Sequence, residues 1–187
     1  MKKNMLSTSK ITSYTLILFL FIISSCVRPQ VTLQKEIEKE EAALNFDSMP
    51  VPDRAKAEQL IALYLKYANE YQDDTLSPSY LFKAGELHVA TGKFNEALDL
   101  FGRVQRYPNY NKVAAALFLQ GFVAENHLRD TTKARNYYEK FIDTYPQHEL
   151  AGDARTMLQQ LSLSPEALIE LFEKNNAGMD TVSNSVN

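Results

Sequence analysis

The chain has 187 residues, a size that suits one domain once any processed segment is removed. Hydrophobic residues make up 45% and charged residues 23%, which excludes a disordered chain, since such chains have fewer apolar residues. The net charge of −3 argues against nucleic acid or an anionic lipid surface as the main partner, because both require basic patches.

The first 25 residues have the features of an export signal. Lys2, Lys3 and Lys10 precede the unbroken apolar run 16–23, and small residues follow it. The run is too short for a normal membrane span, which takes about 20 apolar residues. Removing residues 1–25 takes away three of 20 bases and no acid, so 17 bases face 23 acids and the net charge becomes −6. We therefore expect a signal peptide and an acidic mature chain.

The stretch Ile23-Ser24-Ser25-Cys26 resembles the lipobox of bacterial lipoproteins, and Cys26 is the only cysteine. The resemblance implies cleavage before Cys26, diacylglycerol on its sulfur and usually a fatty acid such as palmitate on its new amino group. One acyl chain binds a membrane marginally, whereas two or more hold firmly. Plain secretion, a retained anchor helix and a buried thiol stay open as alternatives. No disulfide can form within a chain that has one cysteine.

Residues 26–52 are predicted to be a lipidated tether followed by a charged helix. The tether covers 27–33, and the helix covers 33–46. A solvated single helix and a short self-associating coil are both open for this segment. Prolines after residue 49 end the helix. The apolar residues of the helix, four and seven apart, are Leu33, Ile37 and Leu44.

The following residues, 53–174, are predicted to form a helical domain. Asp53 is the expected N-cap of a helix to about Tyr71, and Ser77 is the expected N-cap before Pro78. Further helices are predicted over 78–90, 94–105, 111–128, 131–145, 149–161 and 165–173. The sequence shows no strand or hairpin pattern, so the predicted class is all-α. Residues 175–187 are polar and are expected to be disordered.

The chain repeats itself with a period of 36 to 38 residues. Tyr107-Pro108 recurs as Tyr145-Pro146, and Gly85 recurs as Gly121. A fixed period in this range with two helices per unit is typical of a helical solenoid.

The repeated residues over 78–147 resemble the tetratricopeptide repeat. The resemblance implies a short α-α superhelix in which glycines and alanines let helices approach, aromatic rings fill the wedge between one hairpin and the next, and prolines stop each second helix. Helix 54–71 resembles the second helix of a degenerate unit, and with helix 149–161 it is expected to cover the ends. The residues that define the packing are Gly85, Ala97, Phe101, Pro108, Gly121, Ala134, Tyr138 and Pro146.

The same resemblance implies a partner-binding groove lined by the first helix of each unit. Three phenylalanines flanked by acids suit an extended or helical peptide with apolar anchors and some basic charge. Helix 165–173 could instead fold back and fill the groove. The groove positions are Phe82, Glu86, Val89, Phe118, Phe122 and Glu125.

The sequence contains no recognisable catalytic, cofactor or metal motif. His88, His127 and His148 fall at unrelated places, and His88 is expected to pack in the core. HExxH, Cys/His clusters, GxSxG, the Walker loop and GxGxxG are absent from the sequence. We therefore expect no enzyme, cofactor or metal, with a catalytic protein of unrecognised type as a remaining hypothesis.

Taken together, these features resemble tetratricopeptide-repeat lipoproteins of the cell envelope, of the outer-membrane assembly and Tol-Pal-associated types. The resemblance implies a lipid-anchored scaffold or adaptor for envelope proteins or peptides. A non-catalytic accessory subunit of an outer-membrane or cell-wall enzyme or transport complex is the alternative. Val27 is not the aspartate that retains some lipoproteins in the inner membrane, so an outer-membrane location facing the periplasm is expected.

Overall fold

A computed structural model describes residues 29–44, 53–163 and 167 of the chain. This part contains helices and no strand, which confirms the all-α prediction. None of its helices is long and apolar enough to span a membrane. The signal peptide, Cys26, the tail and, except for residue 167, the helix predicted over 165–173 lie outside the described residues. The helices are α2 (Pro29–Leu44), α3 (Arg54–Glu70), α4 (Ser77–Ala90), α5 (Phe94–Val104), α6 (Val113–Asn126), α7 (Thr131–Thr144) and α8 (Ala151–Gln160).

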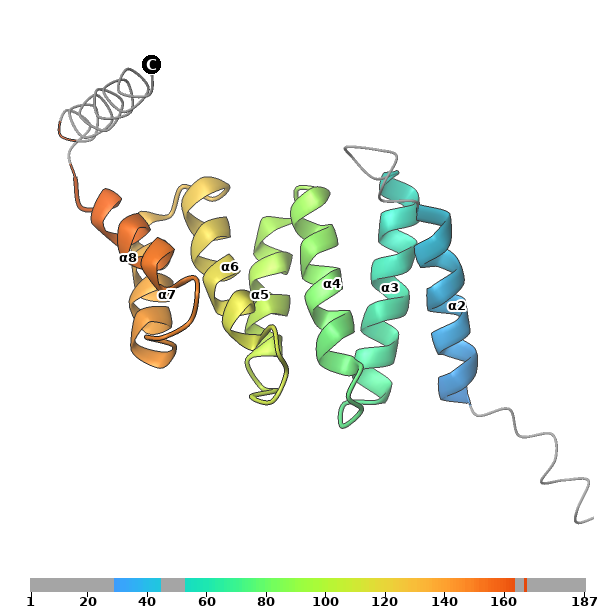
Figure 1. The fold of residues 1–187 in the computed structure, drawn as a ribbon. Coiled ribbons are helices and arrows are strands. Elements are labelled where there is room, and N and C mark those ends of the chain that lie inside the picture. The colour runs from blue at the N-terminus through green and yellow to red at the C-terminus, as the bar shows by residue number, and fades with distance from the viewer. Residues whose placement is uncertain (1–28, 45–52, 164–166, 168–187) are drawn as a thin grey trace, which may run out of the picture.

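The helices stack side by side in chain order (Figure 1). Three antiparallel hairpins, α2–α3, α4–α5 and α6–α7, follow one another, and α8 packs against α7. Each helix packs mainly on the helices before and after it in the chain. This nearest-neighbour arrangement makes the protein a short helical solenoid.

Helix α2 differs from both expectations for it. It begins at Pro29, so residues 29–33 are helical and not a tether. Proline fits the first turn of a helix because its missing N–H has no intrahelical partner there. Leu33, Ile37 and Leu44 are buried in the cluster that includes α3, so α2 is neither solvated all round nor a coil of its own.

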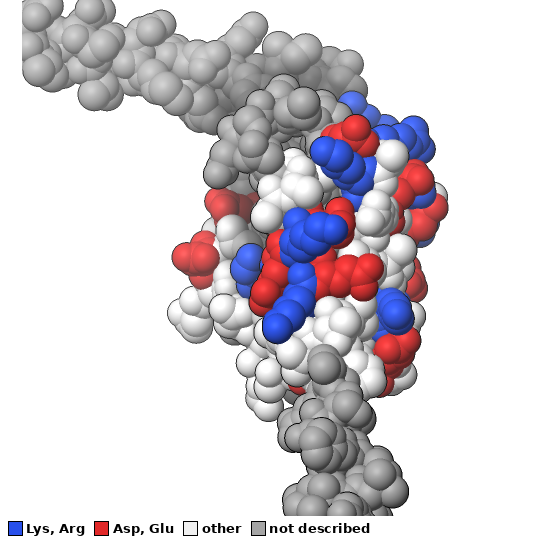
Figure 2. All heavy atoms as spheres, turned by 90° about the vertical axis from the view of Figure 1, so that its right-hand side faces the viewer, with Lys and Arg blue, Asp and Glu red and all other residues white. Residues whose placement is uncertain are grey.

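The N-terminal end of the solenoid is therefore covered by α2 and not by α3. Figure 2 views this end and shows basic and acidic side chains interspersed over it. A polar outer face is what a terminal repeat requires, and none of the other described helices covers this one.

Hydrogen bonds to two tyrosines hold α2 on the stack. The Tyr64 hydroxyl donates to Glu41 Oε1 at 2.6 Å, and Lys83 Nζ of α4 donates to the same oxygen at 2.7 Å. Gln30 Nε2 donates to the Tyr67 hydroxyl at 2.8 Å. Burial, reinforced by the hydrogen bond to Glu41, raises the pKa of Tyr64 far above its usual value, so this phenol stays protonated.

Two aromatic rings occupy the space left by glycines inside their own hairpins. A Cβ on Gly85 would lie 2.7 Å from Phe101 Cε1, and a Cβ on Gly121 would lie 2.6 Å from Tyr138 Cε1. Both rings are 0% exposed. The rings thus pack on the first helix of their own hairpin, α5 onto α4 and α7 onto α6. Ala97 and Ala134 are also fully buried, whereas Pro108 and Pro146 lie exposed in the loops.

One predicted helix cap is confirmed and the other is wrong. The Asp53 carboxylate accepts a hydrogen bond from the Lys56 N–H at 3.1 Å, which makes it the N-cap of α3. Ser77 is the first residue of α4, and its hydroxyl donates to the Tyr71 carbonyl instead of capping. Ser77 is fully buried, so this hydrogen bond joins the end of α3 to the start of α4.

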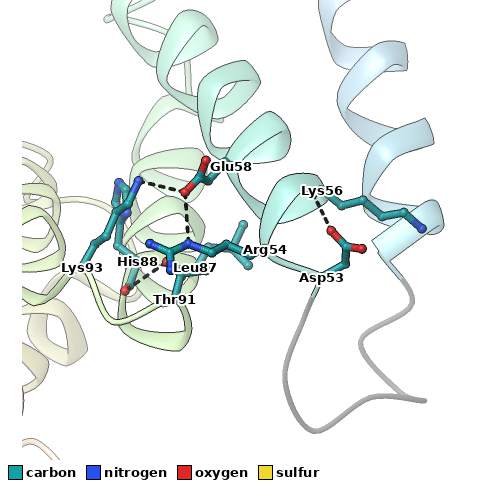
Figure 3. A network of polar contacts seen from close by, with 8 residues as sticks. All are labelled: Asp53, Arg54, Lys56, Glu58, Leu87, His88, Thr91 and Lys93. Atoms are coloured by element: carbon teal, nitrogen blue, oxygen red, sulfur yellow. Dashed lines mark hydrogen bonds and ion pairs between the residues drawn. The ribbon is translucent and has the colours of Figure 1, made fainter.

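The turn between α4 and α5 is fixed to α3 by an ion pair (Figure 3). Gly92 has a φ of 78°, a conformation that glycine adopts without strain, as its predicted place in the turn requires. Lys93 Nζ then lies 3.2 Å from Glu58 Oε1, which also accepts from Arg54 Nε at 3.4 Å. Lys93 and Arg54 hold the pKa of Glu58 below its usual value.

The three loops that follow α3, α5 and α7 share one turn pattern, which explains why α6 and α8 begin later than predicted. In each loop the residue three after a tyrosine donates its N–H to the tyrosine carbonyl, and its own carbonyl accepts from three residues further on. The tyrosines are Tyr71, Tyr107 and Tyr145. Because these turns occupy the positions after each tyrosine, α6 and α8 begin two residues later than predicted, at Val113 and Ala151.

The contact between ring and glycine predicts the effect of adding one methyl group. Gly121→Ala should lower the free energy of unfolding by about 1–3 kcal/mol, because the new Cβ overlaps the buried Tyr138 ring. Gly152→Ala is the matched control, since nothing lies within 4 Å of its Cβ position and the change should be neutral or slightly stabilising. Equal stabilities of the two variants in urea unfolding would contradict the packing described here.

Candidate partner-binding face

The predicted groove residues lie on α4 and α6, the first helices of the second and third hairpins, both of which pack on α5. We call this set of positions, together with Tyr110 and Lys112 of the loop before α6, the α4–α6 face. Glu86 and Phe122 are exposed, with 37% of Phe122 accessible. Val89, Phe118 and Glu125 are half-buried.

Phe82 differs from the other predicted positions because it is only 4% exposed. Its ring centroid lies 5.6 Å from that of Phe101 and 6.4 Å from that of Tyr110. Lys112 Nζ sits over the same ring at 4.8 Å from its centroid, a cation–π contact. Phe82 is therefore a core residue, and the surface above it belongs to Tyr110 and Lys112.

The groove predicted from the sequence consists of helix positions and therefore does not include the loop residues Tyr110 and Lys112. The spacing of Tyr110 could have indicated its position, because it stands three residues after Tyr107 and takes part in the turn that all three loops share. Its counterpart after Tyr145 is His148, whose ring lies edge-on to Phe141 with centroids 5.6 Å apart. The loop thus supplies an aromatic ring in both units, which packs on α4 in the case of Tyr110 and on α7 in the case of His148.

Two phenylalanines of α6 differ in what they can offer to a partner. Phe118 packs on Tyr138 and Phe141, with ring centroids 5.7 Å away in each case. Phe122 contacts only one ring among the described residues, that of His127, at 6.0 Å. His127 in turn stacks on Phe94 of α5 at 4.3 Å. Phe122 is therefore the exposed end of a short aromatic row, and Phe118 mainly supports the hairpin.

Glu125 is engaged inside its own hairpin. The Tyr138 hydroxyl donates to Glu125 Oε2 at 2.8 Å, and burial with this hydrogen bond raises the pKa of Tyr138 far above its usual value. The pair repeats that of Tyr64 with Glu41. Each tyrosine stands seven residues before the tyrosine that ends its helix.

The middle hairpin lacks this polar pair and has an apolar one in its place. Glu125 lies four residues after Gly121, and the residue four after Gly85 is Val89. The ring that packs on Gly85 is Phe101, which has no hydroxyl. By sequence register, glutamate thus accompanies tyrosine and valine accompanies phenylalanine, which indicates that the three hairpins are variants of one packing unit.

Glu86 is the one carboxylate of the α4–α6 face without a hydrogen bond or ion pair among the described residues. It is exposed, yet protein atoms crowd round the carboxylate closely enough that desolvation raises its pKa. The charges of Lys112 and Lys83 oppose this shift. Lys83 already binds Glu41, so Glu86 has only Lys112 as a nearby unpaired cation.

The described residues show no catalytic or metal-binding arrangement. They contain no group of three or more side chains that could hold a metal ion. His88 is buried, as predicted, and its Nδ1 has no hydrogen-bond partner there. Burial, with the nearby charge of Lys93, lowers the pKa of His88, so the ring is neutral at physiological pH.

Comparison with known proteins identifies the repeat. A family model described as tetratricopeptide repeat matches residues 79–110 and 115–148. These are the α4–α5 and α6–α7 hairpins with their following loops. No curated protein matches the chain. The protein is thus an all-α solenoid that contains tetratricopeptide repeats, and such repeats bind protein partners. The family model does not match the α2–α3 hairpin, which packs before them on α4.

Proposed function

We propose that the protein is a lipid-anchored, non-catalytic scaffold or adaptor of the cell envelope that binds protein or peptide partners on the α4–α6 face. The observation that carries the binding site is that the first helices of two tetratricopeptide repeats, both packed on α5, present an exposed aromatic ring, Phe122, and a carboxylate without a hydrogen bond or ion pair among the described residues, Glu86. Aromatic anchors carry much of the binding energy of protein interfaces.

The chemistry of this face defines the partner. An apolar side chain of the partner packs on Phe122 and His127, and a lysine or arginine of the partner reaches Glu86. Such a cation also stabilises the ionised form of Glu86, which its surroundings disfavour in the free protein. Lys112 adds a positive charge beside Phe82, so an acidic residue of the partner fits next to the basic one.

The anchor rests on the sequence alone. The basic first residues, the apolar run and the lipobox-like stretch that ends in Cys26 support export and lipidation. Val27 after Cys26 favours the outer membrane, facing the periplasm. In that location the solenoid holds its partners close to the membrane.

Substitution of the anchor residue tests lipidation. Cys26→Ser should move the protein from the membrane fraction to the soluble fraction, or leave a larger unprocessed form, because no acyl chain can attach. Fractionation with gel mobility and mass spectrometry measures this. Unchanged membrane association and mobility of the variant would reject the lipid anchor.

Substitutions on the α4–α6 face test the binding site. Phe122→Ala and Glu86→Gln should each weaken binding of a copurified partner by roughly tenfold or more, which corresponds to about 1.4 kcal/mol. Glu86→Gln should not destabilise the fold, since the surroundings disfavour the charged form of this residue. Phe118→Ala is unsuitable, because this ring supports Tyr138 and Phe141.

The matched control for the partner measurement is Glu139→Gln on the exposed surface of α7. Copurification from detergent-solubilised membranes, followed by affinity measurement with the purified partner, gives the comparison. Wild-type affinity of the Phe122→Ala and Glu86→Gln double variant would exclude the α4–α6 face as the binding site.

A further inference from the structure

A pocket of about 470 Å³ lies between the loop that joins α3 to α4 and the loop that joins α5 to α6. This volume is within the range of small-molecule sites. Of its residues, Pro108 belongs to the repeat-defining set and Tyr110 to the α4–α6 face, whereas the others belong to neither. Its lining is Asp73, Asp74, Thr75, Pro78, Arg106, Tyr107, Pro108, Asn109, Tyr110 and Asn111.

Two opposite charges of the pocket are unpaired. Asp73 lies in the loop between α3 and α4, and Arg106 lies in the loop between α5 and α6. Both side chains are exposed. Neither side chain has a hydrogen bond or ion pair among the described residues, and they do not bridge each other. Both remain free for a ligand that carries a cation and an anion a short distance apart.

The rest of the pocket is held in place by hydrogen bonds. The Tyr107 hydroxyl donates to the Gln72 carbonyl at 3.0 Å and so joins the two loops. Asp74 accepts from the Leu76 N–H at 2.8 Å and from Gln30 Nε2 at 2.7 Å. The pocket is therefore formed before any ligand binds, and one of its walls is bonded to the start of α2.

The hydrogen bond from Gln30 to Asp74 places the pocket next to the start of α2, close in sequence to Cys26. Pro29 is three residues after Cys26, and three peptide units span at most about 11 Å. Figure 1 shows the start of α2 on the same edge of the solenoid as the two loops. We call this the anchor edge. A lipid on Cys26 would hold it at the membrane surface.

Side chains at the anchor edge match a membrane interface. Val31 is 39% exposed and Leu76 is 38% exposed, and together with Phe122 they are the exposed large hydrophobic residues of the described part. Val31 follows Gln30, and Leu76 is two residues after Asp74, so the Gln30–Asp74 hydrogen bond joins the two backbone segments that carry them. Half-buried Tyr107 and Tyr110 lie in the next loop, and tyrosine is enriched where protein meets lipid head groups.

We propose that the anchor edge lies on the bilayer and that its pocket binds the phosphoethanolamine head group of a membrane lipid. The ammonium group of the lipid binds Asp73, and its phosphate binds Arg106. A zwitterionic head group also agrees with the net charge of −6 expected for the mature chain, which argues against an anionic lipid as the main partner. The orientation rests on the proposed anchoring at Cys26, whereas the head-group site rests on the pocket itself.

Chemical coupling makes the test independent of lipidation in the cell. The chain has a single cysteine and no tryptophan, so the mature protein can be joined through Cys26 to a maleimide-bearing lipid in vesicles and can carry one tryptophan as its only probe. All described helices lie after Cys26, so this chain retains every one of them. Leu76→Trp places the probe on the anchor edge, and Ala90→Trp places it at the far end of α4 as the control.

Quenching by lipids with brominated acyl chains is the measurement. In vesicles of phosphatidylethanolamine and phosphatidylglycerol, the Leu76→Trp probe should be quenched several-fold more than the Ala90→Trp probe. Equal quenching of the two probes would overturn the orientation. Failure of Cys26→Ser to release the protein from cell membranes is a separate result and bears only on the anchor.

The head-group site predicts that quenching of the Leu76→Trp probe depends on the lipid head group and on the charges of the pocket. Replacing phosphatidylethanolamine by phosphatidylcholine, which has no N–H to donate to Asp73, should weaken quenching of the Leu76→Trp probe. Asp73→Asn with Arg106→Gln should weaken it to the same level in phosphatidylethanolamine, whereas the exposed pair Glu139→Gln with Lys140→Gln should not. Identical quenching in both lipids, or no effect of the pocket variants, would overturn the head-group site.

Discussion

An aromatic ring of the second helix seated on a glycine of the first is the contact on which the solenoid depends. Phe101 on Gly85 and Tyr138 on Gly121 leave no room for even one added carbon atom. Buried aromatic side chains contribute several kcal/mol each, and a domain of this size is stable by only about 5–15 kcal/mol. Because each hairpin packs mainly on its neighbours, loss of one such contact in the middle separates the two ends of the stack.

This packing decides which surfaces remain free. The rings fill the interior of each hairpin, and Glu41 and Glu125 are engaged by tyrosine hydroxyls next to them. The described charges without a hydrogen bond or ion pair include Glu86 on the α4–α6 face and Asp73 and Arg106 in the loops at the anchor edge. The first offers Glu86 and the exposed ring of Phe122, and the second offers a preformed pocket with unpaired charges. We infer that protein binding uses the α4–α6 face and membrane contact uses the anchor edge, and that the two surfaces meet at Tyr110.

The repeat itself could be predicted from the sequence because its signals are local. Glycine, alanine and aromatic residues at fixed spacing within two adjacent helices specify a hairpin, and the family match covers the same two hairpins. The α2 helix could not be placed in this way. Its apolar residues pack on α3, which follows after a linker that contains two prolines. The charged sequence 33–46 contains no pattern that indicates which helix it packs on.

The errors at single residues have the same origin in distant contacts. Phe82 is covered by Tyr110 and Lys112, which lie about thirty residues further along the chain, so its helix position alone suggested an exposed ring. Ser77 has the residue type of a cap, but its hydroxyl bonds to Tyr71 of the preceding helix. The helix residues Glu86 and Phe122 of the α4–α6 face could be predicted from the sequence. The loop residues Tyr110 and Lys112 could not.

The central claim is that the three hairpins are variants of one packing unit, and a double-mutant cycle in the middle hairpin tests it most directly. Phe101→Tyr alone should lower the free energy of unfolding by about 1–3 kcal/mol, because Phe101 is fully buried and Val89, which stands in the sequence where Glu125 stands in the next hairpin, offers the added hydroxyl no acceptor. Val89→Glu in the same protein should restore about 1 kcal/mol or more by recreating the pair that Tyr138 forms with Glu125. Additive effects of the two substitutions would contradict the equivalence of the hairpins.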